Sequence, residues 1–447
     1  MPEYARDTIV AAATPPGKGG IGIVRISGND AERIASAMLG KLPEPRLATH
    51  AKVHDKSGAE LDSGIALYFP GTASYTGEPV IEFHGHGGPV VVASVIDAAV
   101  ERGARRAEPG EFSKRAFLNG KLDLVQAEAI ADLIDSGTSQ AARAALRSLS
   151  GSFSHAVENL QQQLVNLRLH VEAAIDFPEE EIDFLSDQDL LQKIDDCAEA
   201  FAKLQRETSI GRVLRDGLQL VIVGKPNAGK SSLLNLLSGQ EAAIVTEVAG
   251  TTRDILRERI EIDGLVVELV DTAGLREDPD RVEAEGIRRA REALGNADGV
   301  LWIQAADEDD AGAMDEELPG EVPVIVLRNK IDMTDDAPGP TQEDPATLNV
   351  SAKTGAGIDD LRESIRKLAG YKDLGEGAFT ARRRHVDAIN AAAKHFQRGR
   401  QALEKNQAGE LLAEDLRLSH EALGEVTGAM SSDDLLGRIF AAFCIGK

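Results

Sequence analysis

The chain has 447 residues, of which 42% are hydrophobic and 28% charged, a composition that excludes wholesale disorder. Because one domain usually takes about 100–200 residues, we expect about three domains. The 74 acidic and 49 basic side chains give a net charge of −25, which argues against nucleic-acid binding over the whole surface.

Targeting signals are not visible in the sequence. No apolar run approaches the about 18 residues that a membrane span needs. The N-terminal sequence MPEYARDTIV lacks the basic head and apolar stretch of a secretory signal. Two cysteines, Cys197 and Cys444, are too few for a disulfide framework and fit a reducing compartment. We therefore expect a cytoplasmic protein without membrane contact.

Residues 1–118 combine short apolar strands with helices, which predicts an α+β domain. Pro89 opens an apolar run that is typical of a helix with Pro in its first turn. His84 and His86 are metal-ligand types, but without a third ligand nearby a structural pair is favoured. The sequences that predict strands are IVAAATPP, IGIVRISG, GIALYFPG and EPVIEFHGHGG.

Residues 119–215 are rich in Ala, Leu, Gln and Glu and predict helices. The segment DFPEEEIDFLSD interrupts them with an acidic cluster around Pro178, where either a metal site or a solvated loop between helices fits, and the loop is favoured. Apolar residues spaced by three and four indicate one buried helical stripe. They are Leu160, Leu164, Leu167, Val171 and Ile175.

Residues 216–375 alternate strands with polar or helical connections, which predicts a parallel sheet. Asp263-Gly264 separates two strands of period two, so one antiparallel hairpin is expected there. The acidic stretch over residues 305–321 predicts a loop. The strands are LQLVIVG, LRERIEI, LVVELVD, VLWIQAA, PVIVLRN and TLNVS.

Residues 376–447 are again helical, and Ser432, Asp433 and Asp434 can cap a last helix. Helical segments thus precede and follow the alternating block. The simplest architecture is a multidomain α/β protein in which an α/β domain is inserted into a discontinuous all-α domain.

A phosphate-binding loop follows the strand LQLVIVG. Residues 224–231 match GxxxxGK[ST] and open a helix, the context in which this motif binds phosphate. Lys230 is expected to reach the β- and γ-phosphates, and the Ser231 hydroxyl to ligate Mg²⁺. The residues expected to contact phosphates are Gly224, Asn227, Ala228, Gly229, Lys230, Ser231 and Ser232.

Two later motifs predict guanine as the base. Asp332, in the sequence Asn329-Lys330-Ile331-Asp332, places a carboxylate where it can accept from guanine N1–H and the exocyclic amine. Adenine has an unprotonated N1 and would be repelled. Ser351-Ala352-Lys353 follows the next strand and is expected to pack over the base edge. The order and spacing of the motifs favour GTP over ATP.

The segments between these motifs predict γ-phosphate sensing. Asp271-Thr272-Ala273-Gly274 can hold the Mg²⁺ shell through Asp271 and the γ-phosphate through the Gly274 amide. In the Thr246–Asp254 segment, Thr252 is expected to complete the Mg²⁺ coordination. Arg253 and Arg257 are either cis arginine fingers or surface arginines.

The hydrolytic water has no obvious glutamine partner in this sequence. A Gln soon after the DxxG motif positions the water in Ras-like proteins, but none occurs here before Gly286. Glu283 is the nearest carboxylate that can do this, and an exposed helix Glu is the equal alternative from the residues alone.

Together these residues resemble the tRNA-modification GTPases of the MnmE (TrmE) family over nearly the whole chain. The resemblance implies an N-terminal α+β folate-binding-like domain (1–118), a discontinuous all-α domain (119–215 and 376–447), and an inserted P-loop GTPase α/β domain (216–375). The segments that carry it are TPPGKGGIGIVRISG, PGEFSKRAFLNGKLDLVQAEAIADLID, AAIDFPEEEIDF, GKPNAGKSSLLN, GTTRD, DTAGLRE, ARRRH and SSDDLLGRIFAAFCIGK.

The resemblance implies a GTP hydrolase that uses Mg²⁺ and is activated by K⁺. With the flavoprotein MnmG, such enzymes form a 5-carboxymethylaminomethyl or aminomethyl group on the wobble uridine of certain tRNAs. The one-carbon donor is a tetrahydrofolate derivative (5-formyl- or 5,10-methylene-tetrahydrofolate). A homodimer and a heterotetramer with MnmG are expected.

The resemblance also implies residue roles. Glu283 matches the water-orienting glutamate, and Cys444 is expected to be a nucleophile or redox group, with a small buried hydrophobe as the alternative. The folate contacts would be Arg25, Glu82, Lys121 and Lys447. The K⁺ ligands would be the Asn227 side chain and oxygens of Thr246, Val248 and Thr251.

Two other functions remain open from the sequence: a GTP-dependent switch in ribosome assembly, and a folate-dependent aminomethyltransferase that carries a GTPase regulator. A switch in ribosome assembly would need a basic RNA-binding appendage, and the net negative charge of the chain counts against one. Arg382, Arg383 and Arg384 are either a local contact for tRNA or a solvated helix face. We expect MnmG to supply much of the basic surface.

Overall fold

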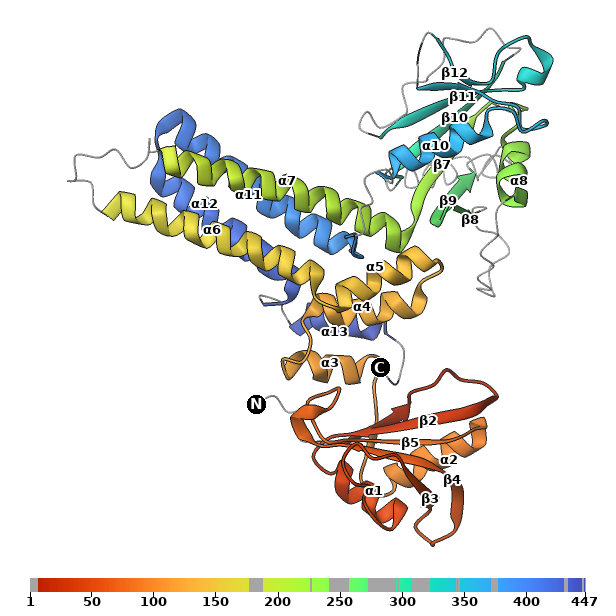
Figure 1. Cartoon of the computed structure of the whole chain (residues 1–447), viewed down its shortest axis with the longest axis vertical. Coiled ribbons are helices and arrows are strands. Elements are labelled where there is room, and N and C mark those ends of the chain that lie inside the picture. Colours follow the sequence, from red (N-terminus) through yellow and green to blue (C-terminus); the bar gives the residue numbers. More distant parts are fainter. Residues whose placement is uncertain are drawn as a thin grey trace, which may run out of the picture. The chain divides into compact units, whose positions relative to one another are not determined.

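The computed structural model describes residues 7–176, 188–225, 227–240, 257–271, 295, 297–306, 322–342, 344, 346–370, 377–429, 433–443 and 446 (Figure 1). The chain divides into two compact units. The first unit comprises Met1–Ala131, Ser148–Cys197 and Ala391–Lys447, and the second comprises Asp132–Arg147 and Ala198–Asn390. Among the described residues, no helix combines the length and apolarity that a membrane crossing requires.

The first unit contains a six-stranded sheet in the order β3-β4-β5-β2-β1-β6. Its pairs are antiparallel except for the parallel pair β1–β6. The strands are β1 (Ile9–Ala12), β2 (Gly19–Ser27), β3 (Thr49–His54), β4 (Glu60–Phe69), β5 (Val80–Gly87) and β6 (Arg105–Arg106).

Helices α1 (Ala31–Leu39) and α2 (Pro89–Val100) pack on one face of this sheet. Strand β2 alternates, because Val24 and Ile26 point into the core beneath the helices while Arg25 points to the other face. Helices α1 and α2 therefore cover one apolar face of the sheet, and the other face carries Arg25 beside a smaller buried cluster of Ile9, Ala11, Ala107 and Phe112.

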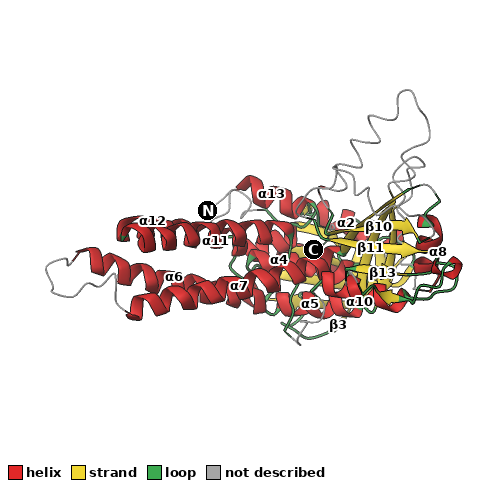
Figure 2. Cartoon of the chain, turned by 90° about the horizontal axis from the view of Figure 1, so that it is seen from above, coloured by secondary structure: helices red, strands yellow, loops and turns green. Residues whose placement is uncertain are grey.

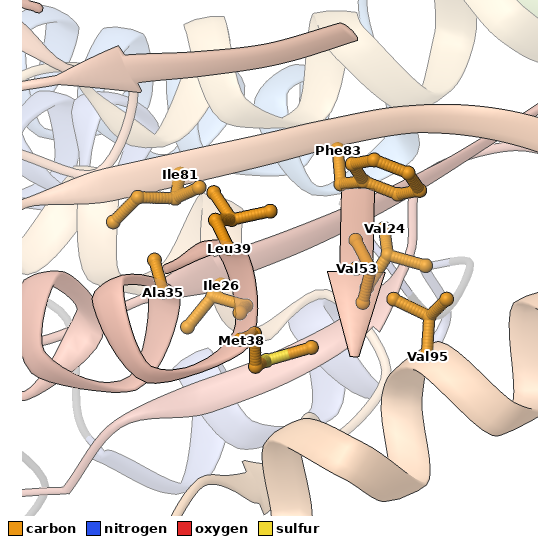
Figure 3. Close-up of a pocket in the computed structure, with 9 residues that line it drawn as sticks. All are labelled: Val24, Ile26, Ala35, Met38, Leu39, Val53, Ile81, Phe83 and Val95. Carbon is orange, nitrogen blue, oxygen red and sulfur yellow. The ribbon is translucent and has the colours of Figure 1, made fainter. Parts of the chain in front are cut away.

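A small cavity lies within this core, between the sheet and helices α1 and α2 (Figure 3). It measures about 10 Å³, near the lower limit of space for one water molecule. It is too small and too apolar to hold a pterin. The residues that line it are Val24, Ile26, Ala35, Met38, Leu39, Val53, Ile81, Phe83 and Val95.

Helices from before and after the second sheet pack together in the first unit. Helix α6 (Ser152–Asp176) lies against α12 (Gly409–Thr427), and Gln161 Nε2 donates to the His420 carbonyl over 3.4 Å. Figure 2 shows these long helices side by side. The predicted stripe of α6 is buried from Leu160 to Val171 and half-buried at Ile175.

Three further helices belong wholly or largely to the first unit. They are α3 (Glu111–Leu118), α4 (Leu124–Asp135) and α13 (Asp433–Ala441), while α7 (Gln188–Asp216) and α11 (Arg383–Asn406) contribute residues to both units. Phe440 of α13 packs against Phe117 of α3, with ring centroids 6.3 Å apart and ring planes tilted by 43°. The C-terminal helix is thus held on the α3 segment.

The second unit contains a seven-stranded sheet in the order β12-β13-β11-β10-β7-β9-β8. Five strands are parallel, as the apolar runs predict. The strands are β7 (Leu218–Gly224), β8 (Arg257–Ile262), β9 (Leu265–Asp271), β10 (Gly299–Ala305), β11 (Val324–Asn329), β12 (Gly339–Pro340) and β13 (Thr347–Asn349). The remaining described α-helices are α5 (Ser139–Leu149), α8 (Lys230–Gln240) and α10 (Ile358–Leu368), and short 3₁₀ helices lie at Gly71–Ala73 and Ile331–Met333.

The predicted hairpin between β8 and β9 is confirmed, with Asp263 and Gly264 both at positive φ (50° and 88°) in its turn. The expectation of one antiparallel pair is wrong, because β12 also pairs antiparallel with β13. This strand has only two residues, Gly339 and Pro340, too few to give a periodic signal.

The junction of α7 and β7 is a single residue, Gly217. Its φ is 85°, its N–H donates to the Val213 carbonyl over 2.9 Å, and a Cβ there would lie 3.0 Å from the Val266 carbonyl oxygen. Arg212 in the last turns of α7 pairs with Asp298 just before β10. The end of the helix is therefore bonded directly to the start of the sheet.

A buried carboxylate, Asp132, fixes the same region of the second unit. It accepts from Arg215 Nε at 2.8 Å and from Arg382 Nη2 at 2.7 Å, and its side chain is 5% exposed. Arg382 is thus engaged in an ion pair, while Arg383 is exposed. Of the three arginines considered for tRNA contact, Arg382 has a structural role.

Candidate functional site

The predicted phosphate loop lies between β7 and α8 of the second unit. Gly224, Asn227 and Gly229 have φ of 157°, 62° and 94°. A Cβ on Gly224 would lie 2.2 Å from the Ile303 carbonyl oxygen, so this position requires glycine. These conformations turn the backbone around the N-terminus of α8, which favours anions.

The Lys230 ammonium is held over this loop. Its Nζ donates to the carbonyl oxygens of Gly224 at 2.8 Å and Lys225 at 2.7 Å, and the residue is 8% exposed. Ser231 and Ser232 follow in the first turn of α8 and are exposed. The loop thus combines a fixed cation with accessible hydroxyl groups at a helix N-terminus.

The Asn329 side chain joins the phosphate loop to the opposite loop. Its Nδ2 donates to the Ala228 carbonyl over 2.8 Å, and its Oδ1 accepts from the Ala352 N–H over 3.0 Å. The residue is 1% exposed. A Cβ on Gly229 would lie 2.2 Å from Asn329 Nδ2, so the glycine makes this approach possible. Three motifs that are far apart in sequence therefore meet at one amide.

Asp332 lies on the same side of the sheet, in the turn after Lys330. Its Oδ1 accepts from the Ser351 hydroxyl over 2.7 Å, and Lys353 Nζ lies 3.6 Å from its Oδ2. The Ser351 hydrogen bond, with the charge of Lys353, holds the pKa of Asp332 below its ordinary value. The carboxylate is therefore ionised at neutral pH and can accept hydrogen bonds from a base.

Several predicted residues of this site lie partly or wholly outside the described residues. Asp271 ends β9, and only its backbone is described. Arg257 begins β8, and again only its backbone is described. The others are Thr246, Val248, Thr251, Thr252, Arg253, Thr272, Ala273, Gly274 and Glu283.

A second cluster lies on the face of the first unit's sheet that is opposite to α1 and α2. Arg25 and Glu82 are directly opposite each other on β2 and β5, and Arg25 Nε donates to Glu82 Oε1 over 2.8 Å. His84 Nε2 lies 3.2 Å from the other oxygen of Glu82. The side chains of Arg25 and Glu82 are 20% and 15% exposed. The pair thus presents hydrogen-bond donors and an acceptor side by side.

Gly446, near the C-terminus, contacts this cluster. Arg25 Nη1 donates to the Gly446 carbonyl over 3.4 Å. Gly446 has φ of 97°, and a Cβ there would lie 1.9 Å from the Ala12 carbonyl oxygen, so the Gly446 backbone is in close contact with the end of β1. Lys121 donates to the Thr72 carbonyl over 2.9 Å. Cys444 and Lys447 lie outside the described residues.

The two histidines of the Gly-rich strand end have different partners. His84 contacts Glu82, whereas His86 Nδ1 lies 2.7 Å from Asp62 Oδ1. Within the described ranges, no group of three or more His, Cys, Asp or Glu side chains is placed to hold a metal ion. Cys197 is buried, and burial raises the pKa of its thiol to about 12, which makes it unreactive.

Both clusters lie in segments that match known protein families. Residues 8–121 match the N-terminus of the GTP-binding protein TrmE, and residues 124–444 match the MnmE helical domain. The chain belongs to the MnmE (TrmE) family. The tRNA modification GTPase MnmE of Stutzerimonas stutzeri is 53% identical over 99% of this chain and 99% of its own length.

Two other MnmE proteins have the same full-length similarity. That of Alkalilimnicola ehrlichii is 52% identical over 99% of this chain and 100% of its own length. That of Erwinia tasmaniensis is 52% identical over 99% of both chains. The similarity therefore includes the phosphate loop, the Asn329 and Asp332 motif and the N-terminal sheet in one chain, as the MnmE resemblance in the sequence predicts.

Some residues of these sites were not found by sequence reasoning. Tyr75 and Phe112 flank Arg25, with ring centroids 5.4 and 5.5 Å from its guanidinium carbon. Arg115 is 4% exposed and pairs with three carboxylates. No spacing pattern joins these residues, because their contacts depend on how the strands and α3 pack.

We expect Asn329→Asp to destabilise the second unit. The substitution replaces the amide donor with a carboxylate oxygen that faces the Ala228 carbonyl. A buried hydrogen bond is lost and a repulsion is created, so the free energy of unfolding should fall by about 1–3 kcal/mol. Urea unfolding can be followed by Trp302, the single tryptophan, which lies in β10 beside β11. The control is Asn235→Asp on the exposed side of α8, and equal unfolding midpoints for the two variants would contradict the role of Asn329.

Proposed function

We propose that this chain is a K⁺-activated GTP hydrolase that acts in tRNA modification. With the flavoprotein MnmG it would form the 5-carboxymethylaminomethyl or aminomethyl group on the wobble uridine of certain tRNAs, from a tetrahydrofolate one-carbon unit. The observation that carries this proposal is the Asn329 amide, which joins a phosphate loop to a base-side loop in a chain that matches tRNA modification GTPases along its length.

The second unit supplies the nucleotide contacts. Lys230 would bind the β- and γ-phosphates, and the backbone amides of residues 227–232 would surround them. The ionised Asp332 would accept from guanine N1–H and the exocyclic amine, with Ser351, Ala352 and Lys353 along the base edge. The exposed Ser231 hydroxyl fits a hard cation that prefers oxygen ligands. Bound Mg²⁺ supplies charge neutralisation at the phosphates, and we propose Thr252 as its second protein ligand.

A monovalent cation would replace the arginine finger of other GTPases. Asn227 is exposed in the phosphate loop and has a positive φ, and its side-chain amide carries an oxygen with lone pairs that a cation can use. It would bind K⁺ together with oxygens of Thr246, Val248 and Thr251. Glu283 would orient the hydrolytic water. Bound K⁺ supplies positive charge beside the phosphates.

The first unit would hold the tetrahydrofolate derivative at Arg25 and Glu82. A pterin carries both donors and acceptors on its edge, and the Arg25–Glu82 pair presents the complementary groups on adjacent strands. Lys121 and Lys447 would bind the carboxylates of the folate tail. Cys444 would act as the nucleophile or redox group near this site.

The assembly would be a homodimer that forms a heterotetramer with MnmG in the cytoplasm. The net charge of −25 makes the partner the main source of basic surface for tRNA. The domains would be the N-terminal folate-binding domain (1–118), the helical domain (119–215 and 376–447) and the inserted GTPase domain (216–375). The MnmE helical match over residues 124–444, which spans the second sheet, supports this insertion.

We expect Asp332→Asn to change base preference from guanine to xanthine. The variant's amide donates to the C2 carbonyl of xanthine but cannot accept from both guanine donors. Affinity for GDP should fall by about 10- to 100-fold, the value of hydrogen bonds to a charged group, and affinity for XDP should rise. Calorimetric titration with both nucleotides measures this. Asp335→Asn on the same loop is the control, and unchanged GDP preference in the Asp332 variant would rule out the base-reading role.

GTP turnover should be at least about 10-fold faster in KCl than in NaCl of equal ionic strength. The reason is that K⁺ would supply the positive charge that an arginine finger supplies in other GTPases, where it raises the rate about 10³–10⁵-fold. Asn227→Gly removes the amide oxygen and keeps the positive φ that glycine tolerates. This variant should lose the difference between the two salts. Equal rates for the unaltered protein in both salts would reject the K⁺ site.

The proposed modification can be tested in cells. In a strain that lacks this gene, mass spectrometry of tRNA should show wobble uridines without the aminomethyl-type group. A plasmid copy of the gene should restore the group, and a copy with Lys230→Ala should not. Normal wobble uridines in the deletion strain would refute the proposed function.

A further inference from the structure

The Arg25 guanidinium lies between two aromatic rings. Its carbon is 5.4 Å from the centroid of the Tyr75 ring and 5.5 Å from that of Phe112, within the about 6 Å over which a cation is attracted to a ring face. Phe112 is completely buried and belongs to the core with Ile9 and Ala11. Tyr75 is only half-buried, so it is the aromatic side chain that borders both Arg25 and the surface.

Tyr75 is held in place by its hydroxyl group and by its own loop. The Tyr75 hydroxyl lies 2.8 Å from the Ser113 hydroxyl in α3. Residues 70–79, which we name the Tyr75 loop, are bonded to β2 through Ser27, whose Oγ is 2.7 Å from Thr76 Oγ1 and donates to Glu78 Oε2 over 2.9 Å. The ring is therefore fixed from two sides.

A buried guanidinium fixes the end of the same loop. Arg115 Nη1 lies 3.2 Å from Glu78 Oε2, and its Nη2 lies 2.9 Å from Glu111 and 2.7 Å from Asp7. Burial opposes the charge on Arg115, but the carboxylates of Glu78 and Glu111 raise its pKa overall. A paired charge at 4% exposure is costly to disturb, which makes the loop rigid.

The Tyr75 loop also contacts the second cation of the proposed folate site. Lys121 Nζ donates to the Thr72 carbonyl over 2.9 Å, and a Cβ on Gly77 would lie 3.3 Å from Lys121 Cγ. One rigid loop thus borders Arg25 through Tyr75 and Lys121 through Thr72.

We infer that Tyr75 is a positioning residue for the folate site. Its ring holds the Arg25 guanidinium against Glu82, so that the pair is arranged for a pterin before the ligand binds, and its loop sets the position of Lys121. This inference rests on the proposed binding of a tetrahydrofolate derivative at Arg25 and Glu82. It adds Tyr75 to the proposed folate site as a residue that affects the ligand through Arg25.

The test is calorimetric titration of the full-length protein with 5-formyltetrahydrofolate. Tyr75→Leu keeps an apolar side chain but removes the ring face, and affinity should fall by about 3- to 30-fold, the range for a partly desolvated cation–π contact. Tyr75→Phe keeps the ring and should restore most of the affinity. Tyr68→Phe is the control, because Tyr68 belongs to the helix-covered core and bonds to Glu32.

A double-variant cycle separates positioning from a general loss of structure. In an Arg25→Gln background, Tyr75→Leu should cause little further loss, because the ring then has no cation to hold. Full additivity of the two losses, or unchanged affinity in Tyr75→Leu, would overturn the role of Tyr75. If the unaltered protein gave no heat with 5-formyltetrahydrofolate, the proposed folate site would fail, and this inference with it.

Discussion

The nucleotide site depends on a single buried amide. Asn329 donates to the Ala228 carbonyl of one loop and accepts from the Ala352 N–H of another, so the distance between the phosphate side and the base side is set by one planar group. Leaving a buried donor or acceptor unpaired costs about 1–3 kcal/mol. The close approach of Gly229 to this amide explains why the glycine is needed there. The Lys230 loop and the Asp332 loop are thus joined without a ligand, which lowers the cost of ordering these two loops when one binds.

Ion pairs join separate segments of the first unit, as the Asn329 amide joins two loops of the second. Arg25 and Glu82 face each other across two strands, and Arg115 joins Asp7, Glu78 and Glu111 in the interior. Arg382 and Arg215 share Asp132 in the second unit. In a chain with far more acidic than basic side chains, these arginines serve internal contacts. These arginines therefore leave little positive surface for contact with an anionic macromolecule.

Much of the second unit could be predicted from local patterns. The apolar runs identify β7, β10 and β11, and Asp263-Gly264 identifies a turn whose two positive φ angles most residues avoid. The phosphate loop was found by its motif. The link through Asn329 could not be found, since its partner Ala228 is 101 positions away and only the parallel order of the strands brings them together.

The first unit was predicted less completely. Helix α1 and strand β3 were not expected, because AERIASAML is short and THAKVH carries polar side chains on its open face. The choice of Arg25 and Glu82 as folate contacts came from the family resemblance, whereas their contact with each other and the ring neighbours of Arg25 came from neither source.

Gly217 has a mechanical consequence for the second unit. Because the connection is one residue long, bonded to Val213 and packed on Val266, any rotation of β7 would be transmitted directly to the last turns of α7.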